Sequence, residues 1–164
     1  MLCPMRGVLQ SCGCLGGIGR SLSRWMMSRG ARNFVFMGCS GTNKAEARKL
    51  VARLEDAGAN VRAIRGDVID PSAVALAVKA CEETLLPIGG VIKPPRPNEA
   101  WHEGIQPKWQ GTWNLHNGLE GHEMDFFLFT SSLSVSHGNA TESNYRAANQ
   151  CLDAFAQWRE RQES

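Results

Sequence analysis

The sequence contains no Asp or Glu before Glu46, although five arginines fall in the same stretch, and it has no long unbroken hydrophobic run. A basic, acid-free N-terminus resembles a mitochondrial transit peptide, which is the alternative interpretation of these residues. They are better explained as a glycine turn followed by a first helix. The apolar run before that turn is short and interrupted by glycine, unlike a signal peptide or a membrane span. We therefore expect no targeting segment and no membrane partner.

The sequence also lacks an imbalance of charge and an ordered set of cysteines. The net charge is +2, and Lys and Arg are mixed with Asp and Glu beyond residue 45, so no basic face predicts a nucleic-acid partner. The six cysteines do not have the tight, regular spacing of a secreted disulfide framework, which favours a reducing, cytoplasmic location. Cys12 and Cys14 could share a metal ion, but no second Cys or His pair completes four ligands, so we expect no metal.

The remaining composition suits one globular domain, which we expect over residues 7–164, because 43% of the 164 residues are hydrophobic. The strands predicted from apolar runs cover residues 8–12, 33–37, 61–65, 88–92 and 125–131. The predicted helices lie between the glycine turn and Gly30 and over residues 44–57, 71–81, 108–119 and 145–160. Buried strands that alternate with helices of this length predict a doubly wound, Rossmann-like α/β fold with a parallel sheet covered on both faces.

Apolar residues at helical spacing predict which helix faces are buried. The buried stripe of the first helix should consist of Ile18, Leu22, Trp25 and Met26, and that of the third should consist of Val74, Ala77, Val78 and Cys81. Asp70 and Pro71 are typical of the N-cap and the first position of that third helix. Trp25, Trp109 and Trp113 fit helix packing better than a platform for stacking bases.

A glycine-rich turn follows the first predicted strand and contains Gly13, Gly16, Gly17, Ile18 and Gly19. A dinucleotide phosphate can approach a helix N-terminus closely where side chains are absent, so the turn is a candidate phosphate cradle. Glycine-rich turns also exist only to reverse the chain, and that alternative stays open on the turn alone. Asp67, after the third strand, is placed either to bind an adenine ring or to serve as an ordinary residue at a strand end.

Four polar residues near the other end of the chain form a recognisable pattern. Ser132 precedes Tyr145 at the spacing of the catalytic serine and tyrosine of short-chain dehydrogenases/reductases, and Asn149 follows one helical turn later. Most members carry lysine at that last position, whereas polyketide synthase ketoreductases carry Asn there and keep the lysine upstream, where this sequence has Lys108. With the stretches 15–21, 125–129 and 144–149, the sequence resembles the ketoreductase (KR) domain of a fungal highly reducing type I polyketide synthase.

The resemblance implies NADPH-dependent reduction of a β-ketoacyl thioester in polyketide biosynthesis. The substrate would be carried on an acyl carrier protein, and other synthase domains would be partners. Tyr145 would donate the proton, Lys108 would stabilise the phenolate, Ser132 would bind the carbonyl, and Asn149 would orient the lysine or a water molecule. The implied cofactor contacts are Gly13, Gly16, Gly17, Ile18, Gly19, Ser40, Asp67 and Val68.

The sequence departs from the family pattern at three places. Cys39 stands where members usually have an Arg that pairs with the 2′-phosphate of NADPH. An internal deletion is expected near residues 93–98, where Lys93-Pro94-Pro95-Arg96-Pro97 replaces a small-residue passage and a helix. The sequence ends at Ser164, before the family's later strand and substrate lid. We therefore expect weak or no turnover in isolation, with a non-catalytic nucleotide-binding or interaction module as the alternative. A generic carbonyl reductase is disfavoured by Asn149.

Overall fold

Five parallel strands form one sheet in the computed structural model, which describes residues 7–11, 15–83, 87–93, 101–135 and 143–162. The strands are β1 (Gly7–Ser11), β2 (Asn33–Gly38), β3 (Asn60–Arg65), β4 (Ile88–Lys93) and β5 (Phe126–Phe129). Their order across the sheet is β3-β2-β1-β4-β5, and every neighbouring pair is parallel. The predicted doubly wound α/β class is confirmed.

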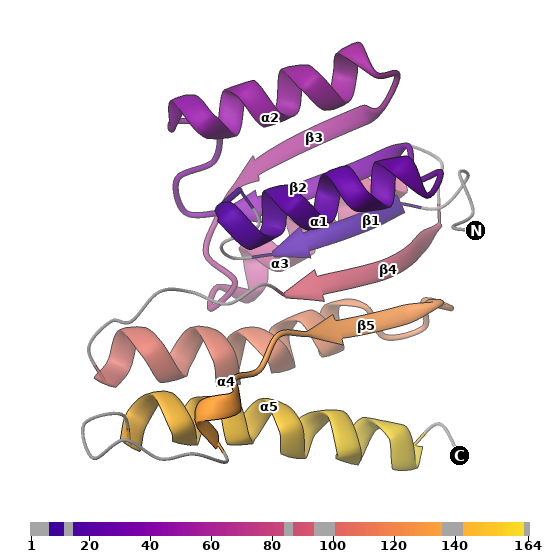
Figure 1. Cartoon of the computed structure of the whole chain (residues 1–164). Helices are drawn as coiled ribbons and strands as arrows, with labels where there is room; N and C mark the ends of the chain where they lie inside the picture. The colour runs from indigo at the N-terminus through magenta and orange to yellow at the C-terminus, as the bar shows by residue number, and fades with distance from the viewer. Residues whose placement is uncertain (1–6, 12–14, 84–86, 94–100, 136–142, 163–164) are drawn as a thin grey trace.

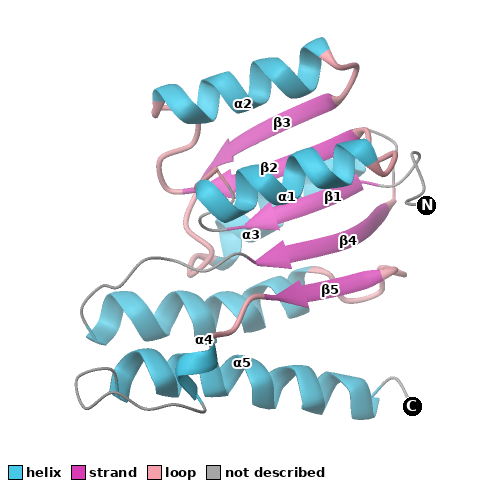
Figure 2. Cartoon of the chain, viewed as in Figure 1, coloured by secondary structure: helices cyan, strands magenta, loops and turns pink. Residues whose placement is uncertain are grey.

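Five helices and one 3₁₀ turn complete the described chain (Figures 1 and 2). They are α1 (Gly17–Ser28), α2 (Ala45–Asp56), α3 (Pro71–Glu82), α4 (Trp101–Gly118), η1 (Leu133–Val135) and α5 (Ser143–Gln162). Side chains of α1 and α2 share one hydrophobic cluster with the sheet, and side chains of α3 and α4 share the cluster on the other face. Helix α5 packs beside α4, so the catalytic candidates on these two helices are brought together.

Helix α3 forms as its sequence predicts. The Asp70 side chain accepts a hydrogen bond from Ser72 N at 2.9 Å, and Pro71 occupies the first turn, where its missing N–H group is not needed. All four residues of its predicted stripe are buried, together with Ala73.

The predicted stripe of α1 is wrong in two places, because Ile18 and Trp25 are 58% and 51% exposed. The buried residues of α1 are Gly19, Ser23 and Met26. Two of these are small, so the helix can lie close to the sheet, and Ser23 Oγ is satisfied by Gln10 Oε1 at 3.2 Å and Gly19 O at 2.8 Å.

Helix α4 is longer than predicted, because it begins at Trp101 and contains Pro107. Proline within a helix removes one backbone hydrogen bond, and here the helix continues through it. Trp109 is 45% exposed and contacts only Trp113 of the same helix among the rings of the described residues, with 6.0 Å between ring centres. Trp113 packs as expected in an aromatic cluster with Phe155 and Trp158.

Candidate active site

The candidate site lies at the carboxyl edge of the sheet, toward which all five strand arrows point in Figure 1. Successive strands run outward from β1 to β3, and the chain then returns to place β4 on the other side of β1. In open α/β sheets, ligands bind outside the carboxyl ends of the strands at such a switch point. Helices α1, α4 and α5 begin at this edge.

Lys108, Tyr145 and Asn149 meet at this edge although they come from two helices. Lys108 Nζ donates to Asn149 Oδ1 at 2.6 Å and lies 4.3 Å from the centre of the Tyr145 ring. Asn149 Nδ2 donates to Tyr145 O at 2.7 Å, one turn earlier on α5. The Asn149 amide therefore uses one end to hold the lysine and the other to hold the backbone of the tyrosine.

The Lys108 ammonium is largely withdrawn from solvent, with 6% of the residue exposed, and Asn149 is completely buried. Burial lowers the pKa of Lys108 from 10.5 to about 8, while the carboxylate of Asp153, one turn beyond Asn149, acts in the opposite direction. A lysine with this pKa changes charge close to physiological pH, and perturbed groups of this kind cluster at functional sites.

Lys93, the last residue of β4, braces the turn of α4 that carries Lys108. Its Nζ donates to Lys108 O at 2.7 Å and to Thr112 Oγ1 at 2.6 Å, and Thr112 Oγ1 also contacts Lys108 O. Lys93 is only 3% exposed. From the sequence, Lys93 was noted only as part of a departure from the family pattern. Its position at the end of a wholly buried strand is the signal that could have identified it as a residue of the site.

Ser132 is partly exposed and lies between β5 and η1. Thr130 anchors the end of β5, since its N and Oγ1 both donate to Lys93 O, at 3.2 and 2.9 Å. Val135 N donates to Ser132 O, and Arg146 Nη2 donates to Val135 O at 3.1 Å. These bonds connect the turn that carries Ser132 with the first turn of α5, which carries Tyr145.

The described part of the glycine turn suits a dinucleotide. Gly16 is the N-cap of α1 and supplies no side chain, and the first turn contains no acidic residue that would repel phosphate. Ile18, one position inside the helix, presents an exposed apolar side chain beside the edge. Gly17 is exposed and Gly19 is buried against the sheet, while Gly13 lies outside the described residues. The backbone N–H groups at the start of α1 suit the phosphates of such a cofactor, and the exposed side chain of Ile18 suits one of its rings.

The ends of β2 and β3 are joined by a contact between Cys39 and Asp67. Cys39 Sγ donates to Asp67 Oδ2 at 3.2 Å, and Ile69 N donates to Asp67 Oδ1 at 3.2 Å. Ser40 is exposed in the turn after β2. Val68 is fully buried, and its carbonyl oxygen accepts a hydrogen bond from Asn114 Nδ2 at 3.0 Å.

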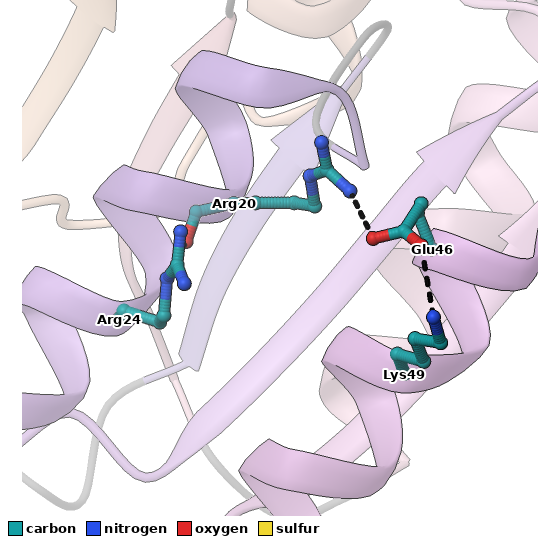
Figure 3. Close-up of polar contacts among 4 residues, drawn as sticks. All are labelled: Arg20, Arg24, Glu46 and Lys49. Atoms are coloured by element: carbon teal, nitrogen blue, oxygen red, sulfur yellow. Dashed lines mark hydrogen bonds and ion pairs between the residues drawn. The ribbon is translucent and has the colours of Figure 1, made fainter.

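The first turns of α1 and α2 are linked by exposed charges, shown in Figure 3. Arg20 Nη1 lies 3.0 Å from Glu46 Oε2, and Lys49 Nζ lies 3.1 Å from Glu46 Oε1. The hydrogen bond from Lys49 is the main cause that lowers the pKa of Glu46, and the Arg20 charge acts in the same direction. Arg24 Nε donates to Arg20 O at 3.2 Å. The charge of Arg20 is thus already paired with a carboxylate.

Two kinds of feature are absent from the described residues. No group of three or more His, Cys, Asp or Glu side chains is arranged to hold a metal ion within the described ranges. No helix among those described is both long and apolar enough to span a bilayer.

Comparison with known sequences gives a consistent result. The sequence profile of the KR domain matches residues 7–164. The chain is 59% identical over 162 residues to the highly reducing polyketide synthase fogA of Aspergillus ruber, which covers 92% of this chain and 7% of the synthase. It is 57% identical over 162 residues to the highly reducing polyketide synthase virA of Hypocrea virens, with the same two coverages. The chain therefore spans only a small part of the curated relatives it matches.

Solved structures of polyketide ketoreductases also match this chain. The structure of A-type ketoreductases from a modular polyketide synthase matches with a TM-score of 0.88 and 26% identity, and the match covers 98% of this chain and 36% of that one. A ketoreductase domain from the bacillaene assembly line matches with a TM-score of 0.85 and 27% identity, covering 99% of this chain and 42% of that one. A short-chain dehydrogenase/reductase from Brucella melitensis, at 16% identity and a TM-score of 0.81, shares the fold.

Proposed function

Because this chain belongs to the KR domain family, we propose that it is the ketoreductase unit of a polyketide synthase and reduces a β-ketoacyl thioester to a β-hydroxyacyl thioester. Its relatives of high identity are fungal highly reducing polyketide synthases, and the structures it resembles at 26–27% identity are polyketide ketoreductases. The chain spans only 7% of the length of those synthases. We therefore propose the reaction, the substrate and the partners and do not take them directly from the relatives.

The observation that carries the proposal is the contact among three side chains at the carboxyl edge. An ammonium, Lys108 Nζ, lies 4.3 Å from the Tyr145 ring and is held there by the Asn149 amide. A phenol becomes an effective acid–base group when a nearby cation stabilises its phenolate form. Burying a lysine beside the only tyrosine of the sequence costs free energy that packing alone does not call for, and Lys108 is only 6% exposed.

The proposed chemistry assigns each group one task. A reduced nicotinamide would supply the hydride that forms the new C–H bond at the ketone carbon. Tyr145 donates its phenolic proton to the ketone oxygen, and the Lys108 ammonium stabilises the phenolate that remains. Ser132 donates a hydrogen bond to the same oxygen, which favours the charge that develops on it. Asn149 holds the ammonium in place.

We propose NADPH as the cofactor, bound with its phosphates over Gly16–Gly19 and its adenosine near Ser40, Asp67 and Val68. The side-chain-free N-cap and the acid-free first turn of α1 support this placement. The proposed partners are an acyl carrier protein and the other domains of a synthase. We propose a cytosolic location, because the spacing of the six cysteines in the sequence is unlike that of a secreted disulfide framework.

The test separates cofactor binding from turnover. The whole chain is titrated with NADPH by fluorescence, and NADPH oxidation is then followed by absorbance with trans-1-decalone or a β-ketoacyl thioester. We expect binding and a slow reaction, because Lys93-Pro94-Pro95-Arg96-Pro97 departs from the family pattern at the end of β4. Tyr145→Phe should bind NADPH normally and lose the reaction.

Two results would contradict the proposal. NADPH oxidation that persists in Tyr145→Phe would remove the tyrosine from the mechanism. Binding of NADPH without any measurable turnover in the unaltered chain would favour the alternative, a non-catalytic nucleotide-binding module. A matched control is Gln150→Ala on the exposed side of α5, which should leave both properties unchanged.

A further inference from the structure

The turn after β2 carries neither an acidic nor a basic side chain from Gly38 to Asn43. In folds of this class, the end of that strand faces the adenosine ribose, where an acidic residue binds the 2′-hydroxyl of NAD and an Arg binds the 2′-phosphate of NADP. The absence of an acid disfavours NAD. A cation that favours NADP would have to lie outside the stretch from Gly38 to Asn43.

Two arginines near this edge already have other partners. Arg20 is paired with Glu46 at 3.0 Å (Figure 3). Arg48 Nη1 donates to Thr42 O at 3.1 Å and to Asn43 O at 2.6 Å, so its guanidinium closes the loop before α2.

Arg65 is placed differently, at the end of β3. It is in register with Gly38 of β2, and its Nε donates to Cys39 O at 3.2 Å. The backbone of the turn also lies close to the aliphatic part of the Arg65 side chain, because a Cβ added at Gly41 would lie 3.5 Å from Arg65 Cβ. Gly41 has a φ of +49°, a conformation that favours glycine. The backbone of the turn and the arginine are therefore held in a fixed relation.

The charge of Arg65 is not neutralised by a carboxylate of the described residues. The acid closest along the chain is Asp67, and its two oxygens accept hydrogen bonds from Cys39 Sγ and Ile69 N. Arg65 is exposed and makes no ion pair within the described ranges. Its two Nη groups can meet an anion bound over the turn.

We propose that Arg65 recognises the 2′-phosphate of NADP(H), and so supplies from β3 the positive charge that Cys39 does not supply from the turn after β2. The inference rests on the proposed function, since it concerns the same cofactor. A guanidinium with two Nη–H donors suits a phosphate, because bidentate, charge-assisted hydrogen bonds to phosphate are strong and directional. The side chain acts on binding and not on the reaction itself.

The test measures binding without any turnover. The dissociation constants of NADP⁺, NAD⁺ and 2′,5′-ADP are determined by calorimetry for the whole chain and for Arg65→Gln. We expect Arg65→Gln to weaken NADP⁺ and 2′,5′-ADP by about tenfold or more and to leave NAD⁺ unchanged. Arg62→Gln is the matched control, since Arg62 is an exposed arginine on the same strand, and it should change none of the three constants.

The possible results separate this inference from the proposed function. If the unaltered chain binds NADP⁺ but Arg65→Gln affects NADP⁺ and NAD⁺ equally, or affects neither, the inference fails and the proposed function stands. An equal loss in Arg62→Gln would also overturn it, because the effect would then be one of general charge. If the unaltered chain binds neither dinucleotide, both proposals fail. The variant Cys39→Arg/Arg65→Gln should recover NADP⁺ binding, and failure to do so would count against a phosphate at this point.

Discussion

The two ends of the candidate site are built in different ways. At the reacting end, Lys108 and Asn149 are buried and bonded to each other across two helices. At the adenosine end, Cys39, Ser40 and Arg65 are exposed, and the connections run largely through backbone atoms of two neighbouring turns. A buried network loses several bonds when one side chain changes, whereas an exposed turn retains its backbone bonds. The reacting end should therefore tolerate substitution far less.

The largest effect, a loss of turnover, is expected for Lys108→Met. This change removes the only cation that contacts the Tyr145 ring among the described residues, so the turnover number should fall about 100-fold or more. NADPH binding should change little, because the adenosine end is untouched. Steady-state rates and a separate binding titration measure the two properties. Lys79→Met, at an exposed lysine of α3, is the control and should leave turnover unchanged. Unchanged turnover in Lys108→Met would contradict the proposed difference between the two ends of the site.

A pH dependence should follow from the same residue. The pKa of Lys108 is lowered to about 8 by burial, so the ammonium is present below that pH and lost above it. The turnover number should fall as pH rises through about 8. In Lys108→Arg the guanidinium stays charged, so the decline should vanish from this range even if the rate is lower throughout.

Stability should change with pH in the opposite direction. The folded-state pKa of Lys108 lies below the ordinary value of 10.5, so unfolding takes up a proton between about pH 8 and pH 10.5. The contribution of Lys108 to the free energy of unfolding therefore rises with pH across that window. Urea denaturation of the unaltered chain and of Lys108→Met, compared at several pH values, isolates this contribution, and identical pH profiles would contradict it.

A moderate effect is expected for Asn149→Ala. The change leaves the Lys108 ammonium without its amide acceptor and the Tyr145 carbonyl without its amide donor, in a buried place. The free energy of unfolding should fall by about 1–3 kcal/mol. Urea denaturation measures it, and Gln150→Ala, at the exposed neighbour, should be neutral. A loss no larger than that of the control would show that the network contributes little.

The smallest effect is expected at the adenosine end, for Cys39→Ala. It removes the hydrogen bond from Cys39 Sγ to Asp67 Oδ2 at an exposed position, so the free energy of unfolding should change by less than about 0.5 kcal/mol. Thermal and urea denaturation check this value. A loss comparable with that of Asn149→Ala would mean that the two ends do not differ in the way described.

Much of the fold could be predicted because local signals agreed with one another. Asp70 and Pro71 predicted the start of α3, and the buried strands predicted the parallel sheet. The family, too, was predicted correctly from the spacing of Ser132, Tyr145 and Asn149, and the match to the KR domain confirms it. Patterns that lie within one element, or at fixed distances along the chain, can be read before the fold is known.

Features that depend on packing between distant segments could not be predicted. The buried face of α1 uses Ser23, whose hydroxyl is satisfied by Gln10 of β1, so a polar residue occupies a core position. Lys93 braces α4 only because β4 ends beside it, and Arg65 approaches Cys39 only because β3 pairs with β2. These partners are 13 to 26 positions apart, and hydrophobic periodicity does not report them.

The strand order has a consequence for how the chain acquires its shape during synthesis. β1 is made first but lies in the middle of the sheet, where Val8 is in register with Gly90. Until β4 leaves the ribosome, one side of β1 has no neighbour, and a bare parallel edge of this kind invites mispairing. A delay in elongation before β4 has emerged from the ribosome should therefore lower the yield of native protein more than a similar delay after that point.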